Sequence, residues 1–304
     1  MYDLAPIALF VYNRPEHTRR TLESLKQNEL ASQSKLYIFS DGAKTPKDEE
    51  KVTEVREIIR NTTGFLSVEV IERTENSGLA NSIISGVTQL ISEYGQVIVY
   101  EDDLISSPHT LRYFNDALNH YRETEKVMHI GSYMFPIQTN NLPETFFFRA
   151  ATSWGWATWE RAWKHFEPDI DILLEQFDEQ KKSAFAIDNS MNYWKQMQEF
   201  KSGKNNSWAI RWYASIFLKD GLTFNPSQSL VQNIGHDGSG VHSGINDIYE
   251  VPIYPKRITA FPDLLEENRP AYEALRTYFA TRKGSLWARM KRFAALKWHQ
   301  YFSK

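Results

Sequence analysis

Four short runs rich in apolar and β-branched residues divide the first third of the chain, and this feature restricts the fold more than any other. The runs are PIALFVY (6–12), KLYIFS (35–40), SVEVIE (67–72) and QVIVYE (96–101). Between them, apolar residues recur at helical spacing over residues 52–59 and 80–91. Strands that alternate with helices at this interval predict an α/β domain with a largely parallel sheet, covered by helices on both faces.

Polar residues follow each predicted strand directly. The four polar segments are Tyr12-Asn13-Arg14, Ser40-Asp41-Gly42, Arg73 to Gly78, and Glu101-Asp102-Asp103. In parallel sheets, the loops at the carboxyl ends of the strands converge on one crevice, where ligands bind. We therefore expect these segments to meet at one edge of the sheet and to form the functional site.

Glu101, Asp102 and Asp103 place three carboxylates side by side after an apolar strand. Adjacent carboxylates repel one another unless a cation or a set of hydrogen-bond donors compensates their charge. Mg²⁺ and Mn²⁺ prefer carboxylate oxygen, and they accept one or two protein carboxylates where phosphate supplies further ligands. The triplet therefore predicts a metal site for a diphosphate. The alternative is a solvated acidic turn before a helix that Ser107-Pro108 opens and that extends to Tyr121.

Several classes of function lack their usual sequence support. The chain contains no cysteine, so disulfides, thiolate catalysis and cysteine-based zinc sites are excluded. Neither the phosphate-loop pattern GxxxxGK nor the dinucleotide fingerprint GxGxxG occurs. The net charge of -3 argues against a surface built for nucleic acid, and we expect no nucleic-acid partner.

Five motifs, in their order and spacing, give the sequence a family resemblance. They are PIALFVYNRP, IFSDGA, NSGLANSI, VIVYEDDLISSP and FFFRAATSWGWATWERAW. Through these motifs, residues 6–245 resemble the GT-A glycosyltransferases and, within them, the group that contains N-acetylglucosaminyltransferase I. The resemblance indicates bacterial polysaccharide-synthesis transferases as the nearest relatives. The resemblance implies a Rossmann-like GT-A fold, with a mostly parallel sheet flanked by helices, to which this sequence adds a C-terminal helical extension.

The resemblance also implies roles for individual residues. Asp103 would bind Mn²⁺ or Mg²⁺, and Asp102 would lie near the ribose of a nucleotide-sugar donor. His242, late in the domain, would be a second ligand of the metal or of the diphosphate. We assign the nucleotide sugar to residues of the strand-end segments and to two tryptophans: Val11, Tyr12, Asn13, Arg14, Asp41, Asn76, Gly78, Glu101, Asp102, Trp154 and Trp156.

Physical arguments support several of these assignments. The planar guanidinium of Arg14 suits phosphate oxygens, and Asp41 can accept hydrogen bonds from a base edge. Asn76 and Gly78 precede a predicted helix, whose N-terminus would favour an anion. The alternatives are a surface arginine, a Ser-Asp-Gly turn, a simple helix cap and, for the two tryptophans, a place in the hydrophobic core.

Sugar transfer also needs a base for the acceptor hydroxyl, and here the sequence departs from the family. N-acetylglucosaminyltransferase I carries acidic residues between two tryptophans, whereas this chain reads Trp208-Ala209-Ile210-Arg211-Trp212. Asp237, in the glycine-rich stretch NIGHDGSGVHSG (233–244), is the first candidate for the base, because such a loop can bring its residues close to a ligand. Glu160 is the second candidate.

The sequence thus predicts a metal-dependent, inverting glycosyltransferase that moves a sugar from a UDP-sugar donor to a glycan or polyprenyl-linked acceptor in surface polysaccharide synthesis. A sugar nucleotidyltransferase is one alternative, although it should carry an early GGxGTR-like loop where this chain has VYNRPEH. A non-catalytic sugar-binding or scaffold protein is another, because the base is missing from its usual place.

We expect three segments along the chain. Residues 1–105 form the nucleotide-sugar-binding half of the domain, residues 106–250 form the acceptor-side half, and residues 251–304 form a basic helical extension. The aromatic and apolar residues near the end of the chain recur at helical spacing among basic ones. This pattern predicts a helix that either contacts an anionic membrane surface or packs against the main domain.

Targeting features are absent from the sequence. The first residues lack the basic start of a secretion signal, and no run approaches the ~18 apolar residues of a membrane span. We therefore expect a cytoplasmic protein, and a membrane-binding extension would place it at the inner face of the membrane.

Overall fold

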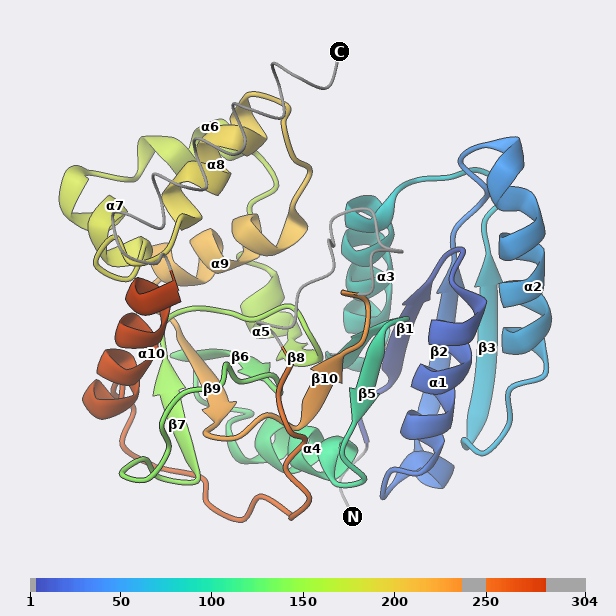
Figure 1. Ribbon diagram of the computed structural model, residues 1–304, viewed down its shortest axis with the longest axis horizontal. Helices are drawn as coiled ribbons and strands as arrows, with labels where there is room; N and C mark the ends of the chain where they lie inside the picture. Colours follow the sequence, from blue (N-terminus) through green and yellow to red (C-terminus); the bar gives the residue numbers. More distant parts are fainter. Residues whose placement is uncertain (1–3, 237–249, 283–304) are drawn as a thin grey trace, which may run out of the picture.

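The computed structural model describes residues 4–236 and 250–282, which form an eight-stranded sheet, a two-stranded sheet and the surrounding helices (Figure 1). The strands are β1 (Ile7–Val11), β2 (Lys35–Ser40), β3 (Ser67–Glu72), β4 (Gln96–Glu101), β5 (Leu104–Ser106), β6 (Val127–Gly131), β7 (Thr145–Phe148), β8 (Trp156–Trp159), β9 (Leu222–Pro226) and β10 (Val231–Asn233). The α-helices are α1 (Pro15–Lys26), α2 (Glu49–Arg60), α3 (Leu79–Tyr94), α4 (Thr110–His120), α5 (Glu160–Trp163), α6 (Ile170–Glu175), α7 (Glu179–Phe185), α8 (Tyr193–Lys201), α9 (Trp208–Leu218) and α10 (Arg269–Arg282). Two short 3₁₀ helices are η1 (Ala31–Gln33) and η2 (Pro46–Asp48).

The large sheet has the strand order β3-β2-β1-β4-β8-β6-β9-β7. β1 to β4 are parallel to one another and β9 is parallel to β6, whereas β7 and β8 run antiparallel to their neighbours. The predicted α/β fold with a mostly parallel sheet is confirmed: all four predicted strands form, and α2 and α3 cover the predicted helical stretches. The predicted halves 1–105 and 106–250 both contribute strands to this sheet, and the boundary between them stays a prediction.

The helix predicted to open at Ser107-Pro108 begins at Thr110 instead. The reason is a separate turn, in which the carbonyl oxygen of Ser107 accepts a hydrogen bond from the N–H of Thr110 at 3.1 Å. No helix in the described part of the chain combines the length and the apolar character that a membrane span requires.

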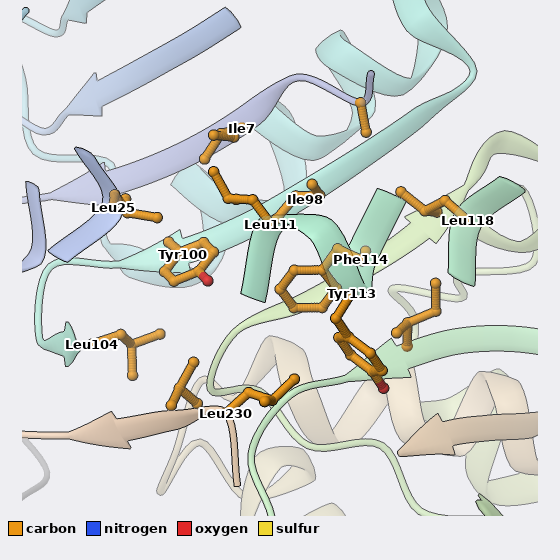
Figure 2. Packing of buried hydrophobic residues seen from close by; sticks show 14 of the residues in the cluster. Ile7, Leu25, Ile98, Tyr100, Leu104, Leu111, Tyr113, Phe114, Leu118 and Leu230 are labelled. Atoms are coloured by element: carbon orange, nitrogen blue, oxygen red, sulfur yellow. The ribbon is translucent and has the colours of Figure 1, made fainter. Parts of the chain in front are cut away.

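Alternate residues of the central strands face two separate hydrophobic clusters, as the two-residue period of a strand requires. On β1, Ile7 belongs to the cluster formed with α1, α2 and α4, while Ala8 belongs to the cluster formed with α3, α5 and α9. Figure 2 shows part of the first cluster, where Tyr100 of β4 meets Phe114 of α4 edge to face at 6.3 Å between ring centroids. Both faces of the sheet are therefore covered by helices.

A third hydrophobic cluster joins α6, α7, α8, α9 and α10 to β7, at the end of the molecule away from β3 (Figure 1). Arg149 connects α10 to the sheet, because its Nε and Nη2 donate to the Glu267 carboxylate at 2.9 and 2.5 Å. The predicted extension 251–304 thus contains a helix, α10, which packs against the main domain. Residues 283–304, which contain most of the predicted basic helix, lie outside the described residues.

The aromatic stretch 146–163 serves mainly to hold this framework together. Trp159 donates its indole N–H to the carbonyl oxygen of Leu118 at 3.0 Å, and Trp163 donates to Thr88 Oγ1 at 2.9 Å. These two contacts of the stretch are therefore structural.

Arg161, in the same motif, caps the C-terminal end of α4. Its guanidinium donates to the carbonyl oxygens of Tyr121, Arg122 and Val127 at 2.7, 2.7 and 2.8 Å. The guanidinium also lies 4.2 Å from the ring centroid of Trp159. The carbonyl oxygen of Tyr121, just after α4, also accepts from the N–H of Thr124 at 3.0 Å, so the arginine adds a second donor there and ties the end of α4 to the start of β6.

We expect Arg161→Ala to lower the free energy of unfolding by about 2 kcal/mol, since it removes charged donors from the partly buried carbonyl groups of Tyr121 and Val127. Arg122→Ala is the matched control, because the Arg122 side chain is exposed and only its carbonyl contacts Arg161. Urea denaturation of both variants measures the difference. Equal stability of the two variants would contradict the capping role.

Candidate functional site

β1 and β4 lie side by side at the point where the strand order reverses. Their parallel pairing sets Phe10 opposite Glu101, so the loop after β1 and the acids after β4 leave the sheet together. Ligands of open α/β sheets bind outside the carboxyl ends of the strands at such a point. The prediction that these two polar segments meet at one edge of the sheet is confirmed.

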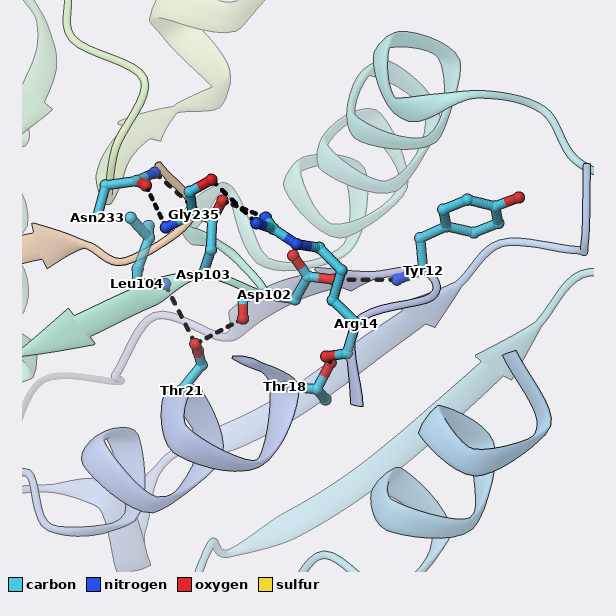
Figure 3. Close-up of polar contacts among 9 residues, drawn as sticks. All are labelled: Tyr12, Arg14, Thr18, Thr21, Asp102, Asp103, Leu104, Asn233 and Gly235. Carbon is cyan, nitrogen blue, oxygen red and sulfur yellow. Dashed lines mark hydrogen bonds and ion pairs between the residues drawn. The ribbon is translucent and has the colours of Figure 1, made fainter. Parts of the chain in front are cut away.

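Arg14 and Asp103 form the central ion pair of this edge (Figure 3). Nη1 of Arg14 lies 2.8 Å from Oδ2 of Asp103, and the two side chains are 13% and 16% exposed. The backbone of Arg14 is fixed by α1, because its carbonyl oxygen accepts from the N–H and Oγ1 of Thr18, both at 2.9 Å. The Arg14 guanidinium therefore contacts Asp103 from a backbone position that α1 holds in place.

Asn233 and Gly235 complete the surroundings of Asp103. Asn233 donates its side-chain amide to Oδ1 of Asp103 at 3.1 Å and accepts from the N–H of Gly235 at 2.8 Å. Nη2 of Arg14 donates to the carbonyl oxygen of Gly235 at 3.0 Å. A Cβ atom on residue 235 would lie 2.1 Å from Oδ2 of Asp103, so the close approach requires glycine.

The carboxylates of Asp102 and Glu101 are less well compensated by positive charge than that of Asp103. The Asp102 carboxylate accepts from the N–H of Tyr12 at 3.2 Å, yet burial and then the charge of Asp103 raise the pKa of Asp102 to about 7. Burial, followed by the charges of Asp103 and Asp102, raises the pKa of Glu101 well above its usual range. Arg14 opposes both shifts without cancelling them. The ionised cluster thus favours a further cation.

The chemistry of this cluster fits a divalent metal that takes part of its ligands from phosphate. Asp103 supplies hard carboxylate oxygens, and Mg²⁺ sites commonly use only one or two protein carboxylates beside a nucleotide. Within residues 4–236 and 250–282, no group of three acidic or histidine side chains is arranged to hold a metal by itself. His242, the predicted further ligand, lies outside the described residues.

Asp41 binds the N-terminus of α3. Its carboxylate accepts from the N–H groups of Gly42, Ser77 and Gly78 at 3.1, 2.9 and 2.8 Å. Asn76 donates its side-chain amide to the carbonyl oxygen of Gly42 at 2.8 Å. The anion at this helix terminus is therefore a carboxylate of the chain itself. Contact of Asp41, Asn76 or Gly78 with a nucleotide stays a prediction.

The remaining residues of the β1 loop are held by neighbours. The side chain of Val11 is buried in the core. The hydroxyl of Tyr12 accepts from the N–H of Lys44 at 2.9 Å, and Asn13 donates to Asp48 at 2.8 Å. These contacts order the loop, and its proposed contact with the nucleotide stays a prediction.

The two predicted sugar-stacking tryptophans have different positions. Trp154 is partly exposed, and its ring lies 5.3 Å from the His236 ring, next to the Gly235 turn at the acids. Trp156 is fully buried and stacks on Trp208 at 5.1 Å between ring centroids. The prediction that Trp156 offers a face to a sugar is wrong, because β8 directs its ring into the core.

Glu160 lies at the opposite edge of the sheet from the acids. β8 is antiparallel to β4 and pairs Trp159 with Gln96, and the N–H of Glu160 donates to the carbonyl oxygen of Gly95 at 2.8 Å. The length of β4, about 16 Å, therefore separates Glu160 from Glu101. The prediction of Glu160 as the base is wrong, and Asp237, the first candidate, lies outside the described residues.

Three residues that build the site had no individual role in the sequence prediction: Thr21, and Asn233 and Gly235 of the glycine-rich stretch 233–244. The Oγ1 atom of Thr21 donates to the carbonyl oxygen of Asp102 at 2.9 Å and accepts from the N–H of Leu104 at 3.1 Å. The Asn-x-Gly spacing at 233–235 was the available signal for the other two, since a short amide can bond the backbone two residues on.

Comparisons with known proteins agree with this architecture. A model of the glycosyl transferase family 2 matches residues 7–187. Similar solved structures include a mannosyltransferase from Pyrobaculum calidifontis, at 12% identity over 72% of this chain and 73% of that chain, with a TM-score of 0.39. Mouse xyloside xylosyltransferase 1 is similar at 12% identity over 70% of this chain and 80% of that chain, with a TM-score of 0.38. TarS from S. aureus is similar at 17% identity over 46% of this chain, with a TM-score of 0.33, and only 24% of TarS is covered. No curated protein matches the sequence.

We expect Asp102→Asn to remove part of the pH dependence of stability. Because the folded-state pKa of Asp102 is about 7, above its usual value, the folded protein binds more protons than the unfolded chain between roughly pH 4 and pH 7. The stability of the wild-type protein therefore falls as pH rises through this window. At pH 8 the variant should be more stable than the wild type by roughly 2 kcal/mol, with little difference at pH 4.

Urea denaturation at several pH values measures this effect. Asp263→Asn is the matched control, since the Asp263 side chain is 95% exposed. If the Asp102→Asn and Asp263→Asn variants keep the same pH dependence, the buried acid is not its source.

Proposed function

The chain belongs to glycosyl transferase family 2, and from this premise we propose that it transfers a sugar from a nucleotide-diphosphate donor, a UDP-sugar, to an acceptor hydroxyl. The resemblance to GT-A glycosyltransferases that the motifs indicated is confirmed at the level of the family and the fold. The observation that carries the proposal is the pairing of one arginine with an acid triplet at the reversal point of the sheet.

Donor binding follows from the charges at this edge. The ionised triplet has more negative charge than Arg14 can compensate, so it suits a diphosphate only together with a divalent metal, Mn²⁺ or Mg²⁺. Asp103 would hold the metal, with His242 as a further ligand, and Arg14 would bind phosphate oxygens through its planar donors. Asp102, whose carboxylate is held by the N–H of Tyr12, would lie near the ribose.

The metal, when bound, compensates the negative charge that develops on the departing nucleoside diphosphate. The chain's own residues orient this end of the donor. Asn233 holds the Asp103 carboxylate through its amide, and α1 fixes the loop that carries Arg14. Because these supports are backbone elements and a partly buried amide, the diphosphate would meet a preorganised site.

The acceptor hydroxyl must lose a proton as its oxygen attacks the anomeric carbon. In the inverting reaction that we propose, the new C–O bond forms on the face opposite the bond that breaks, and the proton passes to a carboxylate. Asp237 is the proposed base. Two peptide bonds separate it from Gly235, which limits the distance between their Cα atoms to about 7 Å. The base would thus come from the turn that contacts Asp103.

Composition and the partly exposed ring of Trp154 support our proposal for the acceptor substrate. A glycan or polyprenyl-linked acceptor in surface polysaccharide synthesis is our proposal, and cytoplasmic location with membrane contact through residues 283–304 belongs to it. A sugar nucleotidyltransferase and a non-catalytic sugar-binding protein are the alternatives that measured transfer would exclude.

We expect UDP to bind in the presence of Mn²⁺ and to bind at least tenfold more weakly to Asp103→Asn, because the variant loses a charged ligand of the metal. Isothermal titration calorimetry of UDP, with and without Mn²⁺, measures the affinity of the wild type and of the variant. Asp263→Asn, with the same change of charge at an exposed position, should bind UDP like the wild type. Equal UDP affinity in all three proteins would refute the metal–diphosphate site.

For the base, we expect Asp237→Asn to reduce the rate of sugar transfer by about 10²–10⁴-fold with little change in UDP affinity. Glu160→Gln should transfer at the wild-type rate, because its side chain lies at the far edge of the sheet. UDP release from a panel of UDP-sugars with candidate acceptors measures the rate. A normal rate for Asp237→Asn would exclude this residue as the base.

A further inference from the structure

Two buried side-chain oxygens, Oδ1 of Asn225 and Oγ1 of Thr152, make no hydrogen bond within residues 4–236 and 250–282. We propose that these oxygens form a subsite for the transferred sugar, in which they bind one hydroxyl group of the donor and thereby select among UDP-sugars. This inference rests on the proposed function and names residues that would recognise the sugar.

The side-chain amide of Asn225 is held in one orientation. Its Nδ2 donates to the carbonyl oxygen and to Oγ1 of Thr223, at 3.0 and 2.8 Å. The Thr223 hydroxyl itself donates to the carbonyl oxygens of Phe148 and Ala150, at 2.9 and 3.0 Å, so its oxygen accepts from the amide. A flipped amide would set two acceptors against each other. Oδ1 of Asn225, a residue only 1% exposed, is therefore an acceptor that needs a donor.

Gly131, at the end of β6, leaves space between the two oxygens. A Cβ atom on this residue would lie 2.6 Å from Oδ1 of Asn225 and 2.8 Å from Oγ1 of Thr152. The backbone of Gly131 does not have a positive φ, so its conformation does not require glycine. The two oxygens thus converge on a point that any side chain at position 131 would fill.

This pair of oxygens suits a hydroxyl group. The Asn225 oxygen can only accept a hydrogen bond, whereas the Thr152 hydroxyl can donate or accept. A ligand hydroxyl can donate to the first and accept from the second, which satisfies both. A site built in this way discriminates strongly against an analogue without the hydroxyl, because the buried acceptor is then left unpaired.

The pair lies at the same edge of the sheet as the acids. β4 and β6 are both antiparallel to β8 and therefore run in the same direction, and Trp156 of β8 pairs with Val99 on one side and with Gly131 on the other. Two strand spacings, about 10 Å, thus separate Gly131 from Val99, which stands two residues before Glu101. A sugar linked to a diphosphate at Asp103 can span this distance.

Thr152 lies in a turn that can admit the sugar. Ala150 and Gly155, at the two ends of this turn, accept hydrogen bonds from Oγ1 of Thr223 and from the N–H of Ser132, both at 3.0 Å. Residues 151–154 between these ends are partly exposed. The two oxygens are shielded from solvent in this structure, so we expect the middle of the turn to move when the sugar binds.

Calorimetry of the full chain with Mn²⁺ tests the subsite. UDP-glucose, UDP-galactose, UDP-N-acetylglucosamine and UDP-N-acetylgalactosamine first identify the donor that the wild type binds most tightly, and analogues of this donor that lack one hydroxyl each are then compared with it. We expect one analogue to bind the wild type about tenfold more weakly, or worse, than the parent donor. In Thr152→Val this difference should fall to about threefold or less, because a methyl group replaces the hydroxyl that pairs with the sugar.

Thr53→Val is the matched control, since it makes the same change at an exposed position of α2, and it should keep the full difference between parent and analogue. Thr152→Ser retains the hydroxyl and should keep the difference as well. UDP, which has no sugar to place in the subsite, should bind to all variants as it binds to the wild type.

Equal affinity of the wild type for the parent donor and every analogue would overturn the inference, and so would an undiminished difference in Thr152→Val. Thermal denaturation checks that the variants fold. If Thr152→Val does not, Gly131→Ala makes the same test, because its methyl group would occupy the point on which the two oxygens converge. A wild-type protein that binds neither UDP nor any of the four UDP-sugars with Mn²⁺ would instead refute the proposed function, so the two failures are distinguishable.

Discussion

The pairing of β1 with β4 is the contact on which the site depends. The paired residues of both strands are buried up to the last position of β4, and alternate side chains enter two different hydrophobic clusters. A shift of one residue would exchange the two faces, so burial on both sides fixes the register strongly. That register brings together Arg14 and Asp103, which are 89 positions apart in sequence. A hydrophobic constraint thus determines the geometry of a polar site.

The same constraint explains why three carboxylates tolerate one another at the end of a buried strand. Rigid backbone donors and one guanidinium surround the acids, while burial still raises the pKa of Asp102 and Glu101. A cluster that was fully compensated would have little affinity for a further cation. The remaining repulsion costs stability in the donor-free protein, and a bound cation would relieve it, which is the basis of the metal–diphosphate site proposed above.

The sequence was sufficient to predict those parts of the fold and the site that follow from local residue patterns. The four strands after which the site forms, and the meeting of Arg14 with the acids, follow from strand period and from the rule for carboxyl ends. The errors at Trp156 and Glu160 both arise in β8. Trp156 pairs with Val99 near the carboxyl end of β4, but its ring lies on the sheet face that packs against α3, α5 and α9, whereas Glu160 follows a strand that runs antiparallel to β4. No local pattern encodes that direction. Asn233 reaches Asp103 through the β10–β5 pairing, which is equally long-range.

Packing also explains why no acid stands between Trp208 and Trp212. In α9, Trp208, Ile210, Arg211 and Trp212 are all buried. The guanidinium of Arg211 donates to the carbonyl oxygen of Pro168 at 3.0 Å and lies 4.4 Å from the ring centroid of Phe200, and burial lowers its pKa.

An acid at position 210 would enter the third hydrophobic cluster, where an ionised carboxylate without a partner is costly. The start of α9 therefore acts as core in this chain. The base of the proposed transfer would therefore come from another segment, and the turn at Gly235 is one that contacts both Asp103 and Arg14.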